Sequence, residues 1–429
     1  MMKSISTWKQ ELTKGAHAAR LAALYCCTPN ETPAQAARYA AVLDGLETTF
    51  GAHTEAGLYS APGRTEIGGN HTDHQHGRVL AGSVNIDMIA AAAPNSLNQL
   101  RVQSEGYDLC VIDLDDLTAR KEEENTTASL LRGECEAFRQ RGAKLSGLDV
   151  YISSNVPKGS GVSSSAAFEV LVGVILNDCF MAEKVSPIAI AQIGQWAENV
   201  YFGKPCGLMD QMACAVGGII AIDFRDPSAP VIETTDFDLT KAGYNLCIVN
   251  TGGNHADLTG DYASVPAEMK AVAAHFGKAV LREVDEQAVM DAIPALREEV
   301  GDRAILRALH FFAENRRVAA QKAALQSGDL DTFFANVIAS GRSSFCYLQN
   351  VYTTKNVAEQ GLSLALCLAE RVLSGKRAAW RVHGGGFAGT IQAFVPAGEV
   401  EHFRAVMDAA FGAGRCMVLR VRPEGALRV

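Results

Sequence analysis

Alternating apolar and polar positions predict β-strands in several stretches of the chain that turn residues separate. In "LSGLDVYISSNVP" the apolar side chains Leu148, Val150 and Ile152 recur at every second position, which is the period of a strand with one buried face. Similar apolar stretches predict further strands: "VLAGSVNIDMIAAAA" (79–93), "QLRVQSEGYDLCVIDL" (99–114), "GGIIAIDF" (217–224), "YNLCIVNT" (244–251), both arms of "AAWRVHGGGFAGTIQAFVP" (378–396), and "CMVLRVR" (416–422).

Apolar residues at spacings of three and four predict helices in other parts of the chain. Residues 1–50 contain good helix formers and few glycines, and "TPNET" followed by Pro33 divides them into two predicted helices. Further helices are expected over about 163–180, 187–202, 268–326 and 399–411. Because strands and helices mix without regular βαβ alternation, we predict an α+β fold.

A division into two domains is predicted near residue 230. The segment "DPSAPVIETTD" (226–236) is polar and contains two prolines, as connecting segments often do. The expected domains are residues 1–230 and 231–429. With 429 residues and 48% hydrophobic content the chain is long enough for more than one core.

Charge and cysteine content narrow the class of protein. The net charge is −9 with 20% charged residues, which argues against a nucleic-acid surface because such a surface needs clustered basic side chains. The 11 cysteines contain no Cys-x-x-Cys pair and are expected to be free thiols in a reducing compartment. No stretch has the roughly 20 apolar residues of a membrane span. We therefore expect a soluble, cytoplasmic protein with no nucleic-acid or membrane partner.

The segment "NVPKGSGVSSSAAFEVLVG" (155–173) has the features of a phosphate-binding loop. Gly159 and Gly161 allow a tight turn and close backbone approach to a ligand. Ser163, Ser164 and Ser165 then open an apolar helix, whose first N–H groups carry partial positive charge. No Walker pattern is present. A capped helix that follows a flexible loop, with no ligand, is the alternative interpretation.

Two further segments combine glycines or a carboxylate with apolar surroundings. Gly384, Gly385 and Gly386 in "HGGGFAGTIQAF" (383–394) predict either close backbone approach to a ligand or a strained hairpin between buried strands. Asp210 lies in "CGLMDQ" (206–211), in an otherwise apolar run. A carboxylate in such a run is expected to be paired, hydrogen-bonded or functional.

The segment "GRTEIGGNHTDHQHGRVL" (63–80) is polar, rich in glycine and contains three histidines. We expect a run of this kind to lie outside the core, as a metal cluster, a sugar-binding loop or a solvated turn. His71, His74 and His76 with Asp73 invite a zinc hydrolase as one interpretation, but the glycines argue against a helix that would put His71 and His74 on one face. His74 and His76 are expected to be ordinary loop residues.

Together these segments resemble the galactokinase family, within the GHMP superfamily of small-molecule kinases. "APGRTEIGGNHTDHQHGRVL" (61–80) is similar to the family signature Pro-Gly-Arg-x-Asn-x-x-Gly-Glu-His-x-Asp-Tyr, and the three other segments resemble its phosphate loop, its Cys-Gly-Ile-Met-Asp-Gln segment and its third glycine motif. The resemblance runs in order from about residue 60 to about 395. It implies a two-lobed α+β fold with the active site between the lobes, ATP and Mg²⁺, and phosphorylation of the anomeric hydroxyl of a sugar.

The resemblance also implies roles for individual residues. Asp210 matches the base that accepts the proton of the sugar hydroxyl, and Arg64 matches an arginine close to it. Ser165 and Glu198 match the metal ligands, whose oxygens suit Mg²⁺. The remaining matches are the phosphate-binding Gly159, Ser160, Gly161, Ser163, Ser164 and Ser165, the sugar-binding Asn70, His71, Asp73, Gly207 and Tyr262, and the third glycine loop Gly384, Gly385 and Gly386.

The chain departs from the family pattern at several positions. Asn70 stands where galactokinases place the glutamate that faces the C6 hydroxyl of the sugar, and Glu66 stands where they have asparagine. An amide donates hydrogen bonds whereas a carboxylate only accepts them, so the C6 end of the substrate stays open. Ala388 and His383 replace a family glycine and threonine, and the first 50 residues have no family counterpart.

Several functions remain open from the sequence. The first is a sugar 1-kinase for D-galactose. The alternatives are a related kinase for a uronic acid, arabinose or an amino sugar, and a sensor that binds sugar and ATP without catalysis. The expected partners are the sugar and ATP, and the expected state is a monomer or weak homo-oligomer.

Overall fold

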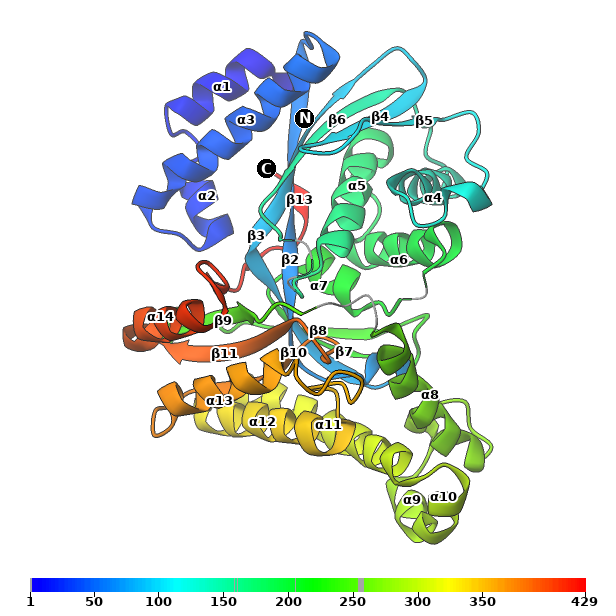
Figure 1. Cartoon of the computed structure of the whole chain (residues 1–429). Helices are drawn as coiled ribbons and strands as arrows, with labels where there is room; N and C mark the ends of the chain where they lie inside the picture. The colour runs from blue at the N-terminus through cyan, green and yellow to red at the C-terminus, as the bar shows by residue number, and fades with distance from the viewer. Residues whose placement is uncertain (1, 158, 160, 205, 254–257) are drawn as a thin grey trace.

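The protein contains two β-sheets with helices packed on both, as seen in a computed structural model that describes residues 2–157, 159, 161–204, 206–253 and 258–429 (Figure 1). The predicted α+β class is confirmed, because antiparallel pairing dominates both sheets and one strand pair, β4 with β6, is parallel. The fourteen α-helices of the described residues are α1 (Ile5–Thr13), α2 (Ala18–Tyr25), α3 (Thr32–Phe50), α4 (Thr127–Gln140), α5 (Ser164–Met181), α6 (Pro187–Ala197), α7 (Met209–Val216), α8 (Thr259–His275), α9 (Glu286–Asp291), α10 (Ile293–Glu299), α11 (Asp302–Ser327), α12 (Leu330–Ser343), α13 (Gly361–Leu373) and α14 (Val400–Phe411).

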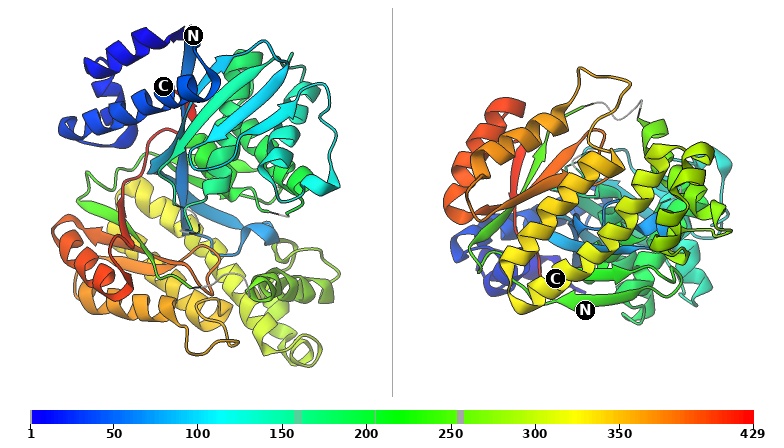
Figure 2. Two further views of the ribbon diagram at one scale, coloured as in Figure 1. Left: turned by 45° about the horizontal axis from the view of Figure 1, so that its top comes forward. Right: turned by 90° about the horizontal axis from the view of Figure 1, so that it is seen from below.

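The larger sheet has the strand order β1-β2-β3-β6-β4-β5, with β13 paired to β2, β7 to β3, and β8 to β7. The smaller sheet has the order β10-β11-β9-β12. Both ends of the chain lie beside β2, since β1 and β13 pair with it (Figure 2). The strands are β1 (Lys3–Ser4), β2 (Glu55–Gly68), β3 (Arg78–Pro94), β4 (Gln99–Ser104), β5 (Cys110–Asp113), β6 (Leu148–Ser154), β7 (Ile219–Asp223), β8 (Val231–Thr235), β9 (Tyr244–Asn250), β10 (Ala379–His383), β11 (Thr390–Pro396), β12 (Cys416–Leu419) and β13 (Leu427–Arg428).

The predicted strands are present, with one division that the pattern did not show. The stretch 99–114 forms two antiparallel strands, β4 and β5, because residues 105–109 turn the chain between them. The domain boundary near residue 230 stays a prediction. Beyond that residue β8 still pairs with β7 of the larger sheet, and β13 returns to it at the end of the chain.

The expectation that segment 63–80 lies outside the core is wrong for its first part. Gly63–Gly68 belong to β2, and the side chains of Arg64, Thr65 and Glu66 are buried. A register shift occurs between Pro62 and Arg64 where β2 pairs with β3, as β-bulges often do beside functional sites. Polar residues are tolerated there because each has charged or hydrogen-bonding partners from other elements.

The first 50 residues cover one face of the larger sheet, opposite α4, α5 and α6 (Figure 1). They form three helices, where the sequence predicted two. The additional break follows α1, at Lys14–His17, where Gly15 has a φ of +72°. Pro33 lies in the first turn of α3, where a missing N–H group costs no helical hydrogen bond. The helices bury the following apolar side chains against the sheet: Trp8, Leu21, Leu24, Leu43 and Leu46.

A buried polar network also fastens these helices to the sheet. The Tyr25 and Tyr39 hydroxyl oxygens lie 2.8 Å apart, and the Tyr25 hydroxyl donates to Asp87 Oδ2 at 2.6 Å. Asp87 lies on β3 and is fully buried, and it also pairs with Arg38 of α3 and with Arg422. The guanidinium groups compensate the buried carboxylate, so the network joins α2, α3, β3 and the end of the chain.

We expect Tyr39→Phe to lower the free energy of unfolding by about 1–2 kcal/mol, because it removes a hydrogen bond from this buried network. Turnover should not change, since Tyr39 is not among the residues that line the cavities described below. Urea denaturation measures the effect, with Tyr347→Phe as the control because the Tyr347 ring is half exposed. If Tyr39→Phe loses no more stability than the control, the buried polar network does not stabilise the helices in the way described.

The hydrophobic helix α5 is a core element of the larger-sheet half of the molecule. It is the one helix of the described residues that is long and apolar enough to span a membrane by length and composition. In the fold it packs against β2 and β3 and against α4, α6 and α7. Its apolar composition is therefore accounted for by contacts within the protein.

Candidate active site

Arg64 and Asp210 form a close ion pair at the centre of the molecule. Arg64 Nε donates to Asp210 Oδ1 and Arg64 Nη2 to Asp210 Oδ2, each at 2.7 Å. Burial alone would raise the pKa of Asp210, but the Arg64 guanidinium and the Ser163 hydroxyl outweigh it and hold the pKa below the ordinary 3.8. Asp210 is therefore ionised at neutral pH. Its place in the first turn of α7 also favours a negative charge.

The glycine–serine loop meets this pair directly. Ser163 caps α5 in the left-handed conformation (φ 56°), and its hydroxyl donates to Asp210 Oδ2. Arg64 Nη1 donates to the Gly161 carbonyl. Gly161 has a φ of +72°, and a Cβ there would lie 2.6 Å from Thr390 Oγ1 of β11, so glycine is required. Gly159 has a left-handed φ as well, and Ser160 lies outside the described residues.

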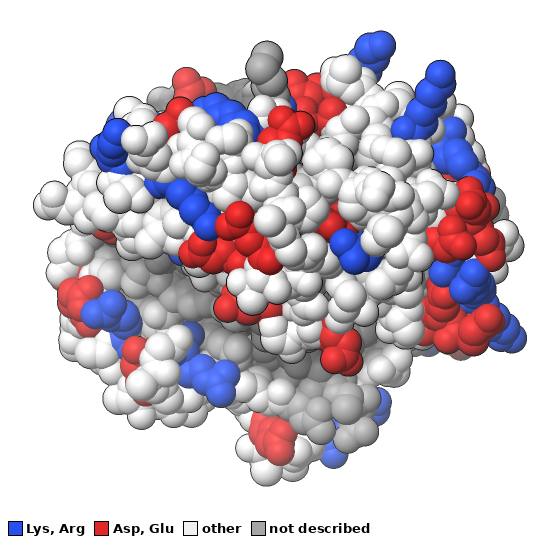
Figure 3. Space-filling view, turned by 90° about the horizontal axis from the view of Figure 1, so that it is seen from above, with Lys and Arg blue, Asp and Glu red and all other residues white. Residues whose placement is uncertain are grey.

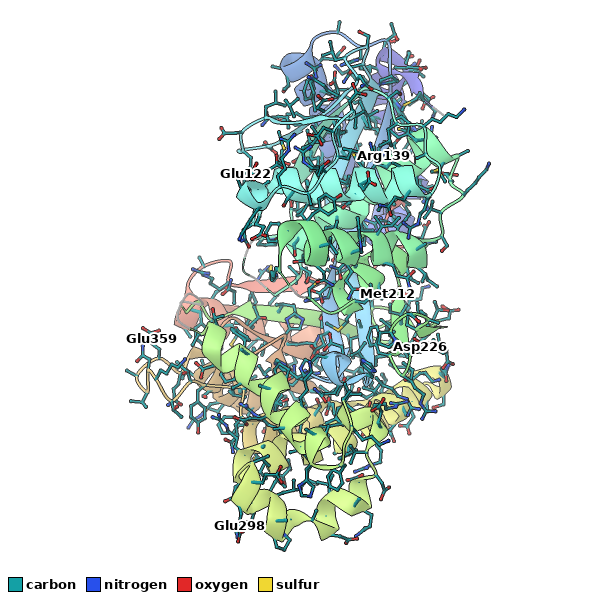
Figure 4. All side chains as sticks on the ribbon, turned by 90° about the vertical axis from the view of Figure 1, so that its right-hand side faces the viewer. Glu122, Arg139, Met212, Asp226, Glu298 and Glu359 are labelled. Atoms are coloured by element: carbon teal, nitrogen blue, oxygen red, sulfur yellow. The ribbon has the colours of Figure 1, made fainter. Side chains whose placement is uncertain are left out.

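One cavity brings together five of the predicted site residues, namely Asp73, Ser165, Glu198, Gly207 and Asp210. It encloses about 210 Å³ and is lined by Asp73, Ser165, Glu198, Lys204, Cys206, Gly207, Met209, Asp210 and Gln211. A Cβ at Gly207 would overlap the Asp73 carboxylate, so glycine permits the close approach of these two segments. Met212, two residues beyond Asp210, marks the position of α7 in the middle of the molecule, far from Glu298 of α10 (Figure 4). Ser165 and Asp210 thus open onto the same space.

A buried polar chain that the sequence analysis missed lies behind Glu198. Gln211 Nε2 donates to Glu198 Oε2 at 3.1 Å and to Glu169 Oε2 at 2.9 Å. Glu169 is fully buried on α5, and burial, with the nearby Glu198 charge, raises its pKa to about 8. At neutral pH Glu169 is therefore largely protonated, and the Gln211 amide holds one oxygen of Glu198 while Lys204 donates to the other. The sequence did contain one signal for this chain of contacts, because Glu169 is a charged residue inside the apolar helix α5.

A second cavity of about 660 Å³ adjoins the same serines. Ser164 and Ser165 line it, together with the aromatic residues Tyr107, Phe168 and Phe202 and with apolar side chains of β3, β4 and β6. Aromatic and aliphatic walls suit the faces of a planar heterocycle. Sequence reasoning could not find this cavity, because its walls come from segments between residues 88 and 202 that have no shared local pattern.

Asn70 does not line the smaller cavity and is fully buried. Its Nδ2 donates to Glu66 Oε1 at 3.0 Å and to the Gly384 carbonyl at 2.8 Å. Its Oδ1 accepts from Asn350 Nδ2 at 2.8 Å and from Ser344 Oγ at 3.1 Å. The amide therefore uses its hydrogen-bonding capacity within the protein. Glu66 in turn pairs with the buried Arg381.

His71 and Tyr262 also contact the third glycine loop. His71 Nε2 donates to the Gly385 carbonyl at 2.9 Å, and the Tyr262 hydroxyl donates to the Gly386 carbonyl at 2.8 Å. Burial lowers the pKa of His71 below 6.5, so the ring is neutral. His71 Nδ1 lies 3.3 Å from His74 Nε2, and no group of three His, Cys, Asp or Glu side chains among the described residues is arranged for a metal ion.

His383, which replaces a family threonine, connects β2 to the start of the third glycine loop. Its Nε2 accepts from the Glu66 backbone N–H at 3.2 Å, and its Nδ1 lies 2.9 Å from Thr390 Oγ1. Burial, and secondarily the Arg64 charge, lowers the pKa of His383 well below 6.5. A neutral ring that donates through Nδ1 and accepts through Nε2 fits both contacts.

Comparisons with known proteins show which sequences and folds this chain resembles. The "GHMP kinases N terminal domain" matches residues 129–218, and the "Galactokinase galactose-binding signature" matches residues 46–94. The solved Lactococcus lactis galactokinase complexed with galactose has a similar fold, with a TM-score of 0.76 at 23% identity, covering 92% of this chain and 100% of that one. A mevalonate kinase structure has a TM-score of 0.62 at 12% identity and covers 86% of this chain.

Fold and site together define a GHMP-type kinase, an enzyme that transfers a phosphoryl group to an alcohol. A galactokinase of Streptomyces coelicolor is 32% identical over 87% of this chain and 92% of its own length, and one of Actinobacillus pleuropneumoniae serotype 5b is 32% identical over 81% and 87%. The chain belongs to the galactokinase family.

Proposed function

We propose that the protein transfers the γ-phosphoryl group of ATP to the anomeric hydroxyl of D-galactose. The observation that supports this most directly is the 210 Å³ cavity, which is shared by Ser165, Glu198, Gly207 and Asp210. Its wall also includes Asp73, from the segment that matches the galactose-binding signature. A sugar hydroxyl near Asp210 and a phosphate near Ser165 would therefore share one small space.

In this proposal Asp210 aligns the acceptor hydroxyl. The bond between the γ-phosphorus and the β–γ bridging oxygen breaks as the sugar C1 oxygen bonds to the phosphorus, and the hydroxyl proton passes to Asp210. Because the pKa of Asp210 is held below 3.8, the carboxylate is a weak base. A loose transition state needs late proton transfer and careful positioning, which suits an orienting role. Arg64 fixes the carboxylate and adds positive charge beside the transferring group.

We assign the phosphates to the start of α5 and the metal to Ser165 and Glu198. The free N–H groups at the start of α5 and the hydroxyls of Ser164 and Ser165 suit phosphate oxygens, and Ser163, whose hydroxyl donates to Asp210, would offer its backbone N–H. A hydroxyl and a buried carboxylate in one cavity are the hard oxygen donors that Mg²⁺ prefers. When bound, Mg²⁺ neutralises negative charge on the phosphates. The 660 Å³ cavity beside these serines would receive the adenine base.

The remaining assignments follow from the family. We propose that Asp73 and Gly207 form the sugar side of the site beside Asp210. Asn70, His71 and Tyr262, which the resemblance also assigns to the sugar, donate to carbonyls of the third glycine loop, and we propose that they support the site by holding this loop. We also propose a cytoplasmic monomer or weak homo-oligomer whose partners are the sugar and ATP. On the face shown in Figure 3, basic side chains alternate with acidic ones.

ADP release measured with a panel of sugars tests the proposed function. The panel contains D-galactose, D-galacturonic acid, L-arabinose and D-galactosamine. We expect turnover with D-galactose to exceed turnover with the others. The buried Glu66–Asn70 pair is where this chain departs from the family pattern for the C6 end of the sugar. If a sugar altered at C6 is turned over faster than D-galactose, that sugar is the substrate instead. ATP and sugar binding without ADP release from any sugar would indicate a sensor.

We expect Asp73→Asn to weaken the binding of the sugar while stabilising the free protein. Burial raises the pKa of Asp73 from 3.8 to about 6, and the Glu66 and Asp210 charges add to the shift. Stability linked to the protonated form is present below pH 3.8 and is lost as the pH rises through 6. At pH 7.5 the asparagine variant should gain about 1–2 kcal/mol, because the wild-type carboxylate is partly solvated in the cavity.

Two measurements check this prediction. The KM for the sugar should rise in the wild type as the pH falls below 6, and this pH dependence should be absent in Asp73→Asn. Thermal unfolding at pH 7.5 and at pH 3.5 should show the stabilisation only at the higher pH. Equal stability of the two proteins at both pH values would contradict the burial argument.

A further inference from the structure

The walls of the 210 Å³ cavity contain more acidic than basic side chains. Asp73, Glu198 and Asp210 contribute three carboxylates, and Lys204 is the one cation among the described lining residues. Arg64 compensates Asp210 from behind and is held by the Gly161 carbonyl as well. Glu198 and Asp73 have no arginine of this kind within the described part of the chain. The balance is unfavourable for a polyphosphate unless cations accompany it.

Lys204 is placed to move. Its Nζ donates to Glu198 Oε1 at 3.2 Å, which uses one of its three N–H groups. The Lys204 side chain is 60% exposed, whereas the Glu198 side chain is 5% exposed. The carboxylate is thus fixed in the cavity wall by Gln211, and the ammonium reaches it from the cavity mouth on a flexible stem. Because the ammonium is largely exposed to solvent, the pair contributes little to stability.

From this arrangement we infer that Lys204 binds the terminal phosphate of ATP and neutralises part of the charge on the transferring group. The inference rests on the proposed kinase function. In the free protein the ammonium compensates Glu198; with nucleotide bound, it turns to a γ-phosphate oxygen. A flexible ammonium suits a group that changes its geometry during transfer. Sequence inspection passed over this lysine, since it lies before "PCGLMDQ" with no motif of its own.

Nucleotide affinity without sugar tests this role, because no turnover then occurs. We expect Lys204→Gln to weaken binding of MgATP about 10- to 100-fold, the effect of losing a charge-assisted hydrogen bond. Binding of MgADP should stay within about threefold of wild type, because ADP lacks the phosphate that the ammonium contacts. Isothermal titration calorimetry with both nucleotides measures the difference. Lys204→Arg keeps the charge and should retain most of the ATP preference.

Lys241→Gln is the matched control. It removes the same charge from a side chain that is 87% exposed and paired with Asp238, so both affinities should stay at wild-type values. Unchanged MgATP affinity in Lys204→Gln, or an equal loss for ATP and ADP, would overturn the inference. A lower melting temperature with an unchanged ATP-to-ADP ratio would show a purely structural role. Failure of the wild type to bind MgATP would instead reject the proposed function.

Discussion

Asp210→Asn is expected to lower kcat by about 10²- to 10⁴-fold while ATP affinity stays close to that of the wild type. The substitution keeps the size of the side chain but removes the charge that Arg64 fixes through two hydrogen bonds of 2.7 Å. An amide cannot take the hydroxyl proton, and one of its two ends donates rather than accepts. ATP binding should persist, because the 660 Å³ cavity proposed for the adenine base is lined by Ser164 and Ser165 and does not include Asp210.

Asp223→Asn is the control for this prediction. Asp223 is also a carboxylate between arginines, since it accepts from Arg282 at 2.8 Å and from Arg78 at 2.8 Å, but it does not line the cavity. We expect Asp223→Asn to lower stability and leave kcat unchanged. ADP release at saturating sugar and ATP measures kcat for both variants. Wild-type turnover in Asp210→Asn would show that another group serves the acceptor hydroxyl.

Exchanging Glu66 and Asn70 together is expected to cost less stability than the sum of the two single changes. Glu66→Asn removes the carboxylate that pairs with the buried Arg381, and Asn70→Glu sets a second carboxylate beside Glu66 and removes the donor to Gly384. Each single change leaves a buried charge without its partner and should cost about 3–5 kcal/mol. The double variant restores one carboxylate and one amide, so the coupling between the two positions should reach about 2–3 kcal/mol.

Urea denaturation of the wild type, both single variants and the double variant gives this coupling. Glu401→Asn is the matched control, because Glu401 pairs with Arg404 but its side chain is 77% exposed; it should cost less than about 0.5 kcal/mol. Strictly additive losses would show that Glu66 and Asn70 do not act as a unit. The double variant also has asparagine and glutamate in the order of the family signature. ADP release measured for this variant with the same panel of sugars shows how the exchange changes substrate choice.

Local signals in the sequence were sufficient for the phosphate loop and its helix. Glycines before three serines and a continuous apolar run predicted a loop followed by a helix, and α5 begins at Ser164. These signals succeed because glycine turns and helical periodicity depend on neighbours within one or two turns. An isolated carboxylate in an apolar run likewise predicted a partner for Asp210, and Arg64 provides it.

The signals failed where burial depends on distant partners. Segment 63–68 was expected outside the core since its residues are polar, yet Glu66 is buried against Arg381, more than 300 residues away in the chain. The Asn70 amide is satisfied by Gly384, Ser344 and Asn350, which also come from distant segments. The break between α1 and α2 was missed because a single glycine gave a weak stop signal.

The sequence alone determined the α+β class, most strands and helices, the helix start at the serines and the need of Asp210 for a partner, because each depends on residue types within a short span. The tertiary structure alone decided that Ser165, Glu198 and Asp210 share one cavity, that Lys204 enters it, and that Asn70 points into the protein. The physical reason is that burial and charge compensation arise from side chains that only folding brings within hydrogen-bonding distance.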